Sequence, residues 1–431
     1  MADATANNEL PVVRLERLPQ WARVGAPILI VLGAITVVGA FLVDAERAWR
    51  AYLVNWLYTL SIAQGAVLLA VIVTITKGLW SRTIRRIALS FVTFLPLAYL
   101  LLIPIFIGRN HIFPWIEHPV AGKEAYLNVP FMAARHFVAL GILVVLSLAF
   151  AYWSLRPDVG LVRGGVPDKL RGLYDRIASN WRGQEVEEAT AHRRIAVLGP
   201  IFALAYAAAL TFVAWDMVMS LEPHWFSTLI GPYFFMAGLL GGIAATVIMV
   251  VLYMRTLGLE SIILPTHFHD LGKLTFAFCI FWAYLFFSQF IVIWYGMLPH
   301  EQEFIAHRFG TPYRTVAQAV FACLFVLPFF GLLGVAPKKR PEVLSIFATI
   351  VLVGLWLERY LLVYPSLYIG VDNVPLGWQE IGMGLGFVGL LLGSVVFFAT
   401  RFPLFQLWQP LSELELSGVH VEVPAERTGG I

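Results

Sequence analysis

Titratable side chains that could move protons or bind a polar ligand occur at only a few places in the long apolar stretches of this chain. Placing a charged side chain in the hydrocarbon of a membrane is costly, so each such residue is a candidate for function. Residues 214–226 read AWDMVMSLEPHWF and hold Asp216, Glu222 and His224 among aromatic side chains. This pattern suits proton transfer near one membrane face; a belt of interfacial aromatics with solvated acids is the structural alternative.

A second candidate site lies in residues 128–140, NVPFMAARHFVAL, where Arg135 and His136 follow each other. Arg135 is a candidate partner for Asp216 or Glu358. One histidine deep in a span does not provide the two axial ligands of a bis-histidine haem, and a structural, hydrogen-bonded histidine is the alternative.

A third site lies in residues 356–368, WLERYLLVYPSLY, which include Glu358 and Arg359. Adjacent residues on a helix point in different directions, so we expect each to find its partner on another helix. The pair is either a structural ion pair between helices or a pair that carries protons or orients a ligand.

A fourth cluster opens a later apolar stretch and contains His267, His269, Asp270 and Lys273, with Ser288 and Gln289 farther along. Asp270 and Lys273 are three residues apart and can pair on one helix face. The cluster is either a capped helix start or a proton entry point, because histidine titrates near neutral pH. The His-x-His spacing has no evident third ligand, so no metal site is predicted.

The elements that must position these residues are membrane-spanning helices. Hydrophobic residues make up 59% of the 431 residues and charged residues only 13%, against about 25% charged in ordinary globular domains. Crossing the hydrocarbon core takes about 20 apolar residues in a helix, and a transmembrane strand is about half as long and alternates. Ten helical spans are predicted near 24–43, 52–76, 84–107, 131–153, 194–220, 230–256, 270–294, 314–334, 343–364 and 379–400.

The distribution of basic residues predicts the orientation. Most of the 30 lysines and arginines fall in the N-terminal segment 1–23, the even-numbered loops and the tail 401–431, which places both termini in the cytoplasm. The loop at about 154–193 is the only long cytoplasmic connection and contains an amphipathic stretch near 168–181. It is either a helix at the membrane interface or a docking site for a partner.

Several classes of function are excluded. The net charge of +3 gives no reason to expect nucleic-acid binding, and the two cysteines cannot hold a cysteine-ligated iron–sulfur cluster. No CxxCH motif for c-type haem occurs, and the polar first residues do not form a cleavable signal peptide. We therefore expect an all-α integral membrane protein that binds no redox cofactor of its own.

Longer segments resemble a known family. The segments AWDMVMSLEPHWFSTLIGPYFF and HDLGKLTFAFCIFWAYLFFSQFIVIWYG are similar to the NrfD/polysulfide-reductase-like membrane subunits of alternative complex III, of the ActF type. The segments RAWRAYLVNWLY, KEAYLNVPFMAARHF and LERYLLVYPSLY extend the resemblance over nearly the whole chain. It implies ten helices arranged as two four-helix bundles, spans two to five and six to nine, plus two peripheral helices.

The resemblance also implies a function and partners. Such complexes of the bacterial inner membrane oxidise quinol and pass electrons through an iron–sulfur protein and multi-haem and mono-haem cytochrome c subunits, beside a second NrfD-like subunit. For this chain the resemblance implies a membrane subunit with quinol or quinone as a candidate ligand. Asp216, Glu222 and His224, together with Arg135, His136, Glu358 and Arg359, would serve an outer proton path. His267, His269, Asp270, Lys273, Ser288 and Gln289 would serve an inner one.

Two other functions fit the residues less well. A membrane anchor of another NrfD-type reductase would show different partners. A secondary transporter predicts interrupted helices and polar residues near the membrane midplane, whereas the polar residues here gather near the two faces.

Overall fold

A computed structural model describes residues 10–408, and within them it contains ten helices long and apolar enough to cross a membrane. Eight spans contain a single long helix each: α1 (Ala26–Val43), α2 (Ala45–Ile75), α7 (Val129–Val162), α9 (Gln184–Met217), α10 (Ile230–Leu257), α11 (Pro265–Gly296), α16 (Pro341–Leu367) and α17 (Trp378–Ala399). The third span is divided into α3 (Arg85–Leu89), α4 (Leu95–Leu100) and α5 (Leu102–Ile107), and the eighth into α13 (Arg314–Phe321) and α14 (Leu327–Gly331). The predicted all-α membrane fold is confirmed.

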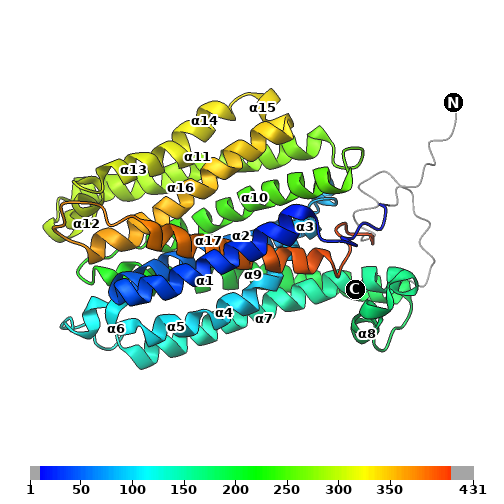
Figure 1. Cartoon of the computed structure of the whole chain (residues 1–431), viewed down its shortest axis with the longest axis horizontal. Helices are drawn as coiled ribbons and strands as arrows, with labels where there is room; N and C mark the ends of the chain where they lie inside the picture. Colours follow the sequence, from blue (N-terminus) through cyan, green and yellow to red (C-terminus); the bar gives the residue numbers. More distant parts are fainter. Residues whose placement is uncertain (1–9, 409–431) are drawn as a thin grey trace.

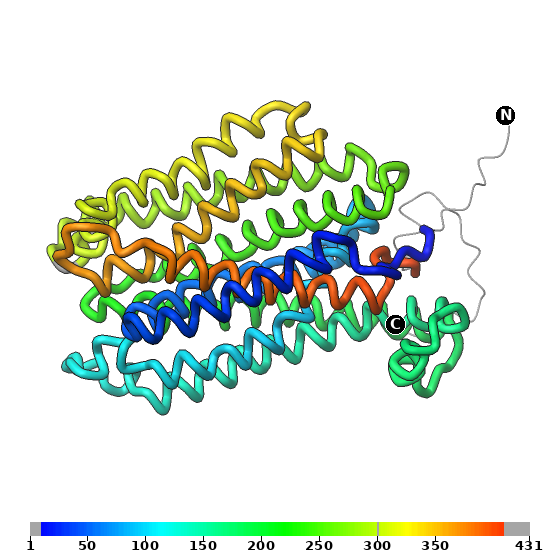
Figure 2. Tube along the Cα trace, viewed as in Figure 1, coloured from blue at the N-terminus to red at the C-terminus, as the bar shows by residue number. Residues whose placement is uncertain are grey.

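The helices run roughly along one axis and define two ends of the molecule (Figure 1). The short helices α8 (Asp168–Ile177) and α15 (Val335–Lys339) lie at one end of the molecule, which we call the α8 end. Helices α6 (Arg109–Ile112) and α12 (Pro299–Phe309) lie at the other, the α12 end. Because the number of spans is even, the described chain begins and ends at the α8 end (Figure 2).

Two bundles form the body of the molecule. The first contains α2, the divided third span, α7 and α9; the second contains α10, α11, the divided eighth span and α16. Helices α1 and α17 pack against each other along the junction of the bundles, and α17 also contacts α2 (Figure 2). This is the predicted arrangement of two four-helix bundles with two peripheral helices.

Small residues set the closest helix contacts. Helix α2 meets α10 where a Cβ on Gly242 would lie 2.1 Å from the backbone nitrogen of Ala66. Helix α1 meets α17 where a Cβ on Gly33 would lie 2.2 Å from the Cα of Gly386. Lipid gives helices no hydrophobic reason to associate, so close backbone approach and dispersion must hold them together.

The connection between α7 and α9 is more ordered than its sequence suggests. The loop predicted at about 154–193 is helical at both ends, because α7 continues to Val162 and α9 begins at Gln184. Helix α8 starts at the expected Asp168 and ends at Ile177, with Leu170 and Tyr174 buried. The amphipathic stretch therefore packs on the bundle through its apolar face.

Candidate functional site

The first candidate site lies in the first bundle near the α12 end and is centred on Asp216. Arg135 on α7 donates two hydrogen bonds to the Asp216 carboxylate on α9, both 2.8 Å long. Nε2 of His136 lies 2.9 Å from the same carboxylate, and both Asp216 and His136 are fully buried. The predicted pairing of Arg135 with Asp216 is confirmed.

Aromatic rings surround this ion pair. The Arg135 guanidinium lies 3.9 Å from the centre of the Tyr126 ring and 4.5 Å from that of Phe131. Burial, together with the negative charge of Asp216, raises the pKa of Tyr126 above its ordinary value. Arg135 thus donates a hydrogen bond to each oxygen of the Asp216 carboxylate. This arrangement stabilises the ionised carboxylate and fixes the spacing of α7 and α9.

The second candidate site lies in the second bundle, on α16. Glu358 and Arg359 are both about 1% exposed, and Nη1 of Arg359 donates to Oε2 of Glu358 over 2.8 Å. The expectation that these neighbours cannot meet is therefore wrong: the long arginine side chain folds back over its own turn. Its other terminal nitrogen donates to the backbone oxygen of Phe234 on α10 (3.0 Å), which explains the direction it takes.

Glu358 also lines a small internal cavity of about 50 Å³ enclosed by α10, α11, α12, α13 and α16. Oε1 of Glu358 and, across the same cavity, the buried indole nitrogen of Trp282 form no hydrogen bond of standard geometry with a described residue. The Tyr233 hydroxyl, which belongs to the same cavity lining, interacts with both side chains, and the Gln289 side chain there is nearly buried. These polar groups around a void large enough for one or two waters indicate a place for water or a ligand hydroxyl.

An aromatic groove between α11 and the eighth span adjoins this cavity. The groove has a volume of about 760 Å³ and shares Phe286, Phe290 and Phe321 with the cavity lining. Tyr284 and Phe287 on its rim are 61% and 57% exposed, on apolar helices where lipid would surround them. The cavity with Glu358 therefore shares a wall with a groove on the exposed apolar face of these helices.

A third ion pair joins this cavity to the α12 end. Arg308 on α12 lines the cavity and donates to Glu222 over 2.8 Å, to the Ser366 hydroxyl over 2.6 Å, and to two backbone oxygens. Ser366 in turn donates to Glu222 over 2.7 Å. Burial opposes ionisation of Glu222. The charge of Arg308, its hydrogen bond and the hydrogen bond from Ser366 outweigh this effect and hold the pKa of the Glu222 carboxyl below its ordinary value.

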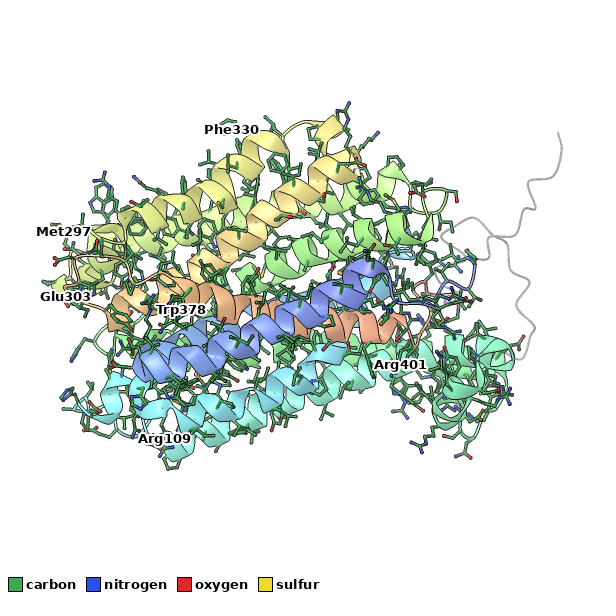
Figure 3. The ribbon with its side chains drawn as sticks, viewed as in Figure 1. Arg109, Met297, Glu303, Phe330, Trp378 and Arg401 are labelled. Carbon is green, nitrogen blue, oxygen red and sulfur yellow. The ribbon has the colours of Figure 1, made fainter. Side chains whose placement is uncertain are left out.

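The predicted outer-side residues therefore divide into two groups. Glu358 lines the cavity directly and Glu222 is joined to it through Arg308, while Asp216 with its partners belongs to the first bundle. His224 is exposed. At the α12 end His307 lies 3.6 Å from Glu222, which extends the titratable groups toward the surface that carries the labelled Glu303 and Met297 (Figure 3).

Four of the six predicted inner-side residues, His267, His269, Asp270 and Lys273, lie at the start of α11, whereas Ser288 and Gln289 lie near its other end. Nδ1 of His267 accepts a hydrogen bond from the backbone N–H of Leu264, and Lys273 pairs with Asp270 at 2.6 Å, as expected from their spacing. His269 is partly exposed. At 1.5 Å per residue, Gln289 is about 24 Å farther along the helix than Lys273. Ser288 is next to Gln289 in sequence and does not line the cavity that Gln289 lines.

Other buried ion pairs were not singled out by the sequence. Glu380 on α17 accepts two hydrogen bonds from Arg47 (2.6 and 2.8 Å) and one from the Tyr364 hydroxyl (2.7 Å). At the α8 end, Arg156 pairs with Glu187, and Arg86 pairs with Asp158. Glu380 and Arg86 could have been identified from the sequence as candidate residues, since both are charged residues inside predicted spans.

Comparison with known proteins adds no identification, because no protein-family model matches the chain and no curated protein matches it. The fold and these sites define an all-α multi-pass membrane protein with several buried ion pairs.

Proposed function

We propose that the chain is a membrane subunit of a respiratory quinol:cytochrome c, or quinol:acceptor, oxidoreductase complex in the bacterial inner membrane. The observation that carries the proposal is the buried Glu358 carboxylate, whose Oε1 accepts no hydrogen bond of standard geometry from a described residue, in a cavity next to an aromatic groove on the exposed face of α11 and the eighth span. A lipid-soluble quinol reaches its site from the membrane, and its ring packs well among aromatic side chains. The family resemblance of the sequence points to the same chemistry.

In this proposal the quinol ring lies in the groove and one hydroxyl donates to Oε1 of Glu358. Oxidation of quinol to quinone releases two protons and two electrons. Glu358 accepts the two protons one after the other, and water in the cavity transfers each of them toward Glu222 and the α12 end. The electrons leave through the iron–sulfur and haem c cofactors of partner subunits. The excess of basic residues at the α8 end favours a cytoplasmic position for that end, and the α12 end would then release protons outside.

Substituting the carboxylate in the assembled complex tests this role. The Glu358→Gln variant keeps the size of the side chain and removes its basicity, and a positioned general base contributes about 10²–10⁴-fold to a rate. Quinol oxidation should fall by at least about tenfold with the subunit composition unchanged. Glu260→Gln, the same change on an exposed side chain at the α8 end, is the matched control. Unchanged quinol turnover in assembled Glu358→Gln complex would exclude this role.

A membrane anchor in another NrfD-type reductase is the second candidate, because Asp216, Arg135 and His136 form a closed ion-pair cluster of the kind that stabilises a bundle. In that case the chain would purify with a reductase, and the Glu358→Gln variant would retain full turnover.

A further inference from the structure

A separate cleft lies at the α8 end, where the chain enters α1, leaves α17 and passes α8. It has a volume of about 600 Å³ and is lined by both charged and apolar side chains. The cleft lies at the opposite end of the molecule from α12 and shares no lining residue with the Glu358 cavity. A role for this cleft therefore does not depend on the function proposed for the Glu358 cavity.

Backbone hydrogen bonds fix the basic residues on one side of this cleft. The N–H of Leu15 donates to the oxygen of Ala399 over 3.0 Å, and the N–H of Leu404 donates to the oxygen of Val13 over 2.8 Å. Arg14 lies between Val13 and Leu15 in the first segment. Arg401 lies between Ala399 and Leu404 in the opposing segment. The two arginines are thus held in neighbouring segments before any ligand binds.

The charge of the cleft is positive. Arg14, Lys169 and Arg401 line it together with one acid, Glu16. None of the three basic side chains forms an ion pair with another residue in the range 10–408. Arg401 instead lies over the Phe397 ring, 3.4 Å from its centre, at the point where α17 ends beside the α8 region (Figure 3).

The other wall of the cleft is apolar and belongs to two membrane-spanning helices. Ile30 on α1 and Phe397 on α17 line it, and Phe397 is 49% exposed toward the surroundings of the bundle. Gly393 leaves a gap in this wall, since a Cβ there would meet only the Ile30 side chain, at 4.0 Å. The cleft therefore continues from a basic rim into an apolar channel along the span.

We propose that this cleft binds one anionic phospholipid, with its phosphate headgroup among Arg14, Lys169 and Arg401 and an acyl chain along Ile30, Gly393 and Phe397. Charge complementarity selects this occupant: basic pockets between helices at a membrane interface attract acidic headgroups, and each basic residue near the surface contributes about a fivefold gain in binding. The apolar wall requires a ligand with an acyl chain, which inorganic phosphate lacks.

Thermal unfolding of the purified full-length protein in detergent, with lipid added, tests the proposal. Phosphatidylglycerol or cardiolipin should raise the unfolding midpoint, whereas phosphatidylcholine and inorganic phosphate should not. Arg14→Gln and Arg401→Gln should each weaken the lipid response about fivefold. Gly393→Leu should weaken it by filling the acyl channel without changing charge. Lys339→Gln, an exposed lysine at the same end but outside the cleft, is the matched control and should respond like the wild type.

Three results would overturn the assignment. Equal shifts with phosphatidylglycerol and phosphatidylcholine would show a general lipid effect. An equal loss in Lys339→Gln would show diffuse attraction to a basic surface rather than a site. A lipid response that arises only after removal of residues 409–431, which contain Glu413, Glu415, Glu422 and Glu426, would assign the cleft to that acidic segment.

Discussion

Replacing Arg308 by methionine removes the residue that joins α12, α16 and the Glu222 segment. Its side chain is 4% exposed and donates four hydrogen bonds, to Glu222, Ser366 and the backbone oxygens of Phe304 and Leu362. Methionine has a similar length and no charge, so the packing against the Phe304 ring is largely kept. The substitution leaves the Glu222 carboxylate, itself 12% exposed, with the Ser366 hydroxyl as its remaining strong donor.

The expected cost is large because an uncompensated buried charge is left behind. Breaking a buried ion pair by removing one partner costs about 3–5 kcal/mol. Removing both charges, in Arg308→Met with Glu222→Gln, should cost less than Arg308→Met alone. The exposed pair Arg255–Glu342, with side chains 55% and 59% exposed, is the control, and Arg255→Met should cost about 1 kcal/mol or less.

Unfolding of the purified protein in mild detergent, followed by far-UV circular dichroism against denaturant, measures these three variants and the single Glu222→Gln variant. The loss of stability in the double variant is compared with the sum of the losses in the two single variants. The two differ by a coupling energy only if Arg308 and Glu222 interact. If Arg308→Met is no less stable than Arg255→Met, or if the double variant is the least stable of all, Arg308 does not neutralise Glu222 as described.

Three further predictions follow from other contacts. Since the pKa of Glu222 is held below its ordinary value near 4.5, its ionised form stabilises the fold above that pH; this contribution should be lost as pH falls through the lower folded value, and a thermal-midpoint profile of Glu222→Gln should lack that acid-side loss. Gly242→Val should destabilise the protein by about 1–3 kcal/mol or more, because its Cβ would meet the α2 backbone, while Gly172→Ala, with open space around it, should be near neutral in the same assay. Asp158 accepts hydrogen bonds from the backbone N–H groups of Leu407 and Trp408, so Asp158→Ala, which removes the acceptor, should speed limited proteolysis near residue 407, and unchanged cleavage would contradict that anchoring role.

The spans could be predicted closely from sequence because hydropathy acts locally. The tenth span was expected at 379–400 and α17 is Trp378–Ala399; the sixth was expected at 230–256 and α10 is Ile230–Leu257. The connection around α8 was predicted less well. Helices α7 and α9 continue as polar helices beyond the hydrocarbon, where a hydropathy scan ends the span although the backbone continues.

Side-chain partners were harder to predict, since they depend on how helices face each other. Asp216 and Glu358 were both candidate partners for Arg135 because all three lie near the same end of their spans, and only the packing of α7 on α9 selects Asp216. Arg359 was expected to find a partner on another helix, and it does bind the backbone oxygen of Phe234 on α10. Its contact with Glu358 was not expected, because spacing rules describe where side chains start and not how far a long arginine can fold back. The pairing of Arg47 with Glu380 joins residues 333 positions apart, and only the packing of α17 on α2 brings them together.

Purifying the tagged full-length chain from its native membranes in mild detergent, then recording the haem spectrum and quinol-dependent cytochrome c reduction of the product, decides whether it belongs to a quinol-oxidising complex. The assignment predicts stoichiometric c-type haem, an iron–sulfur subunit and quinol oxidation that elutes with the chain. A chain that elutes without haem or iron, from membranes that retain their quinol oxidation after its gene is deleted, would contradict it.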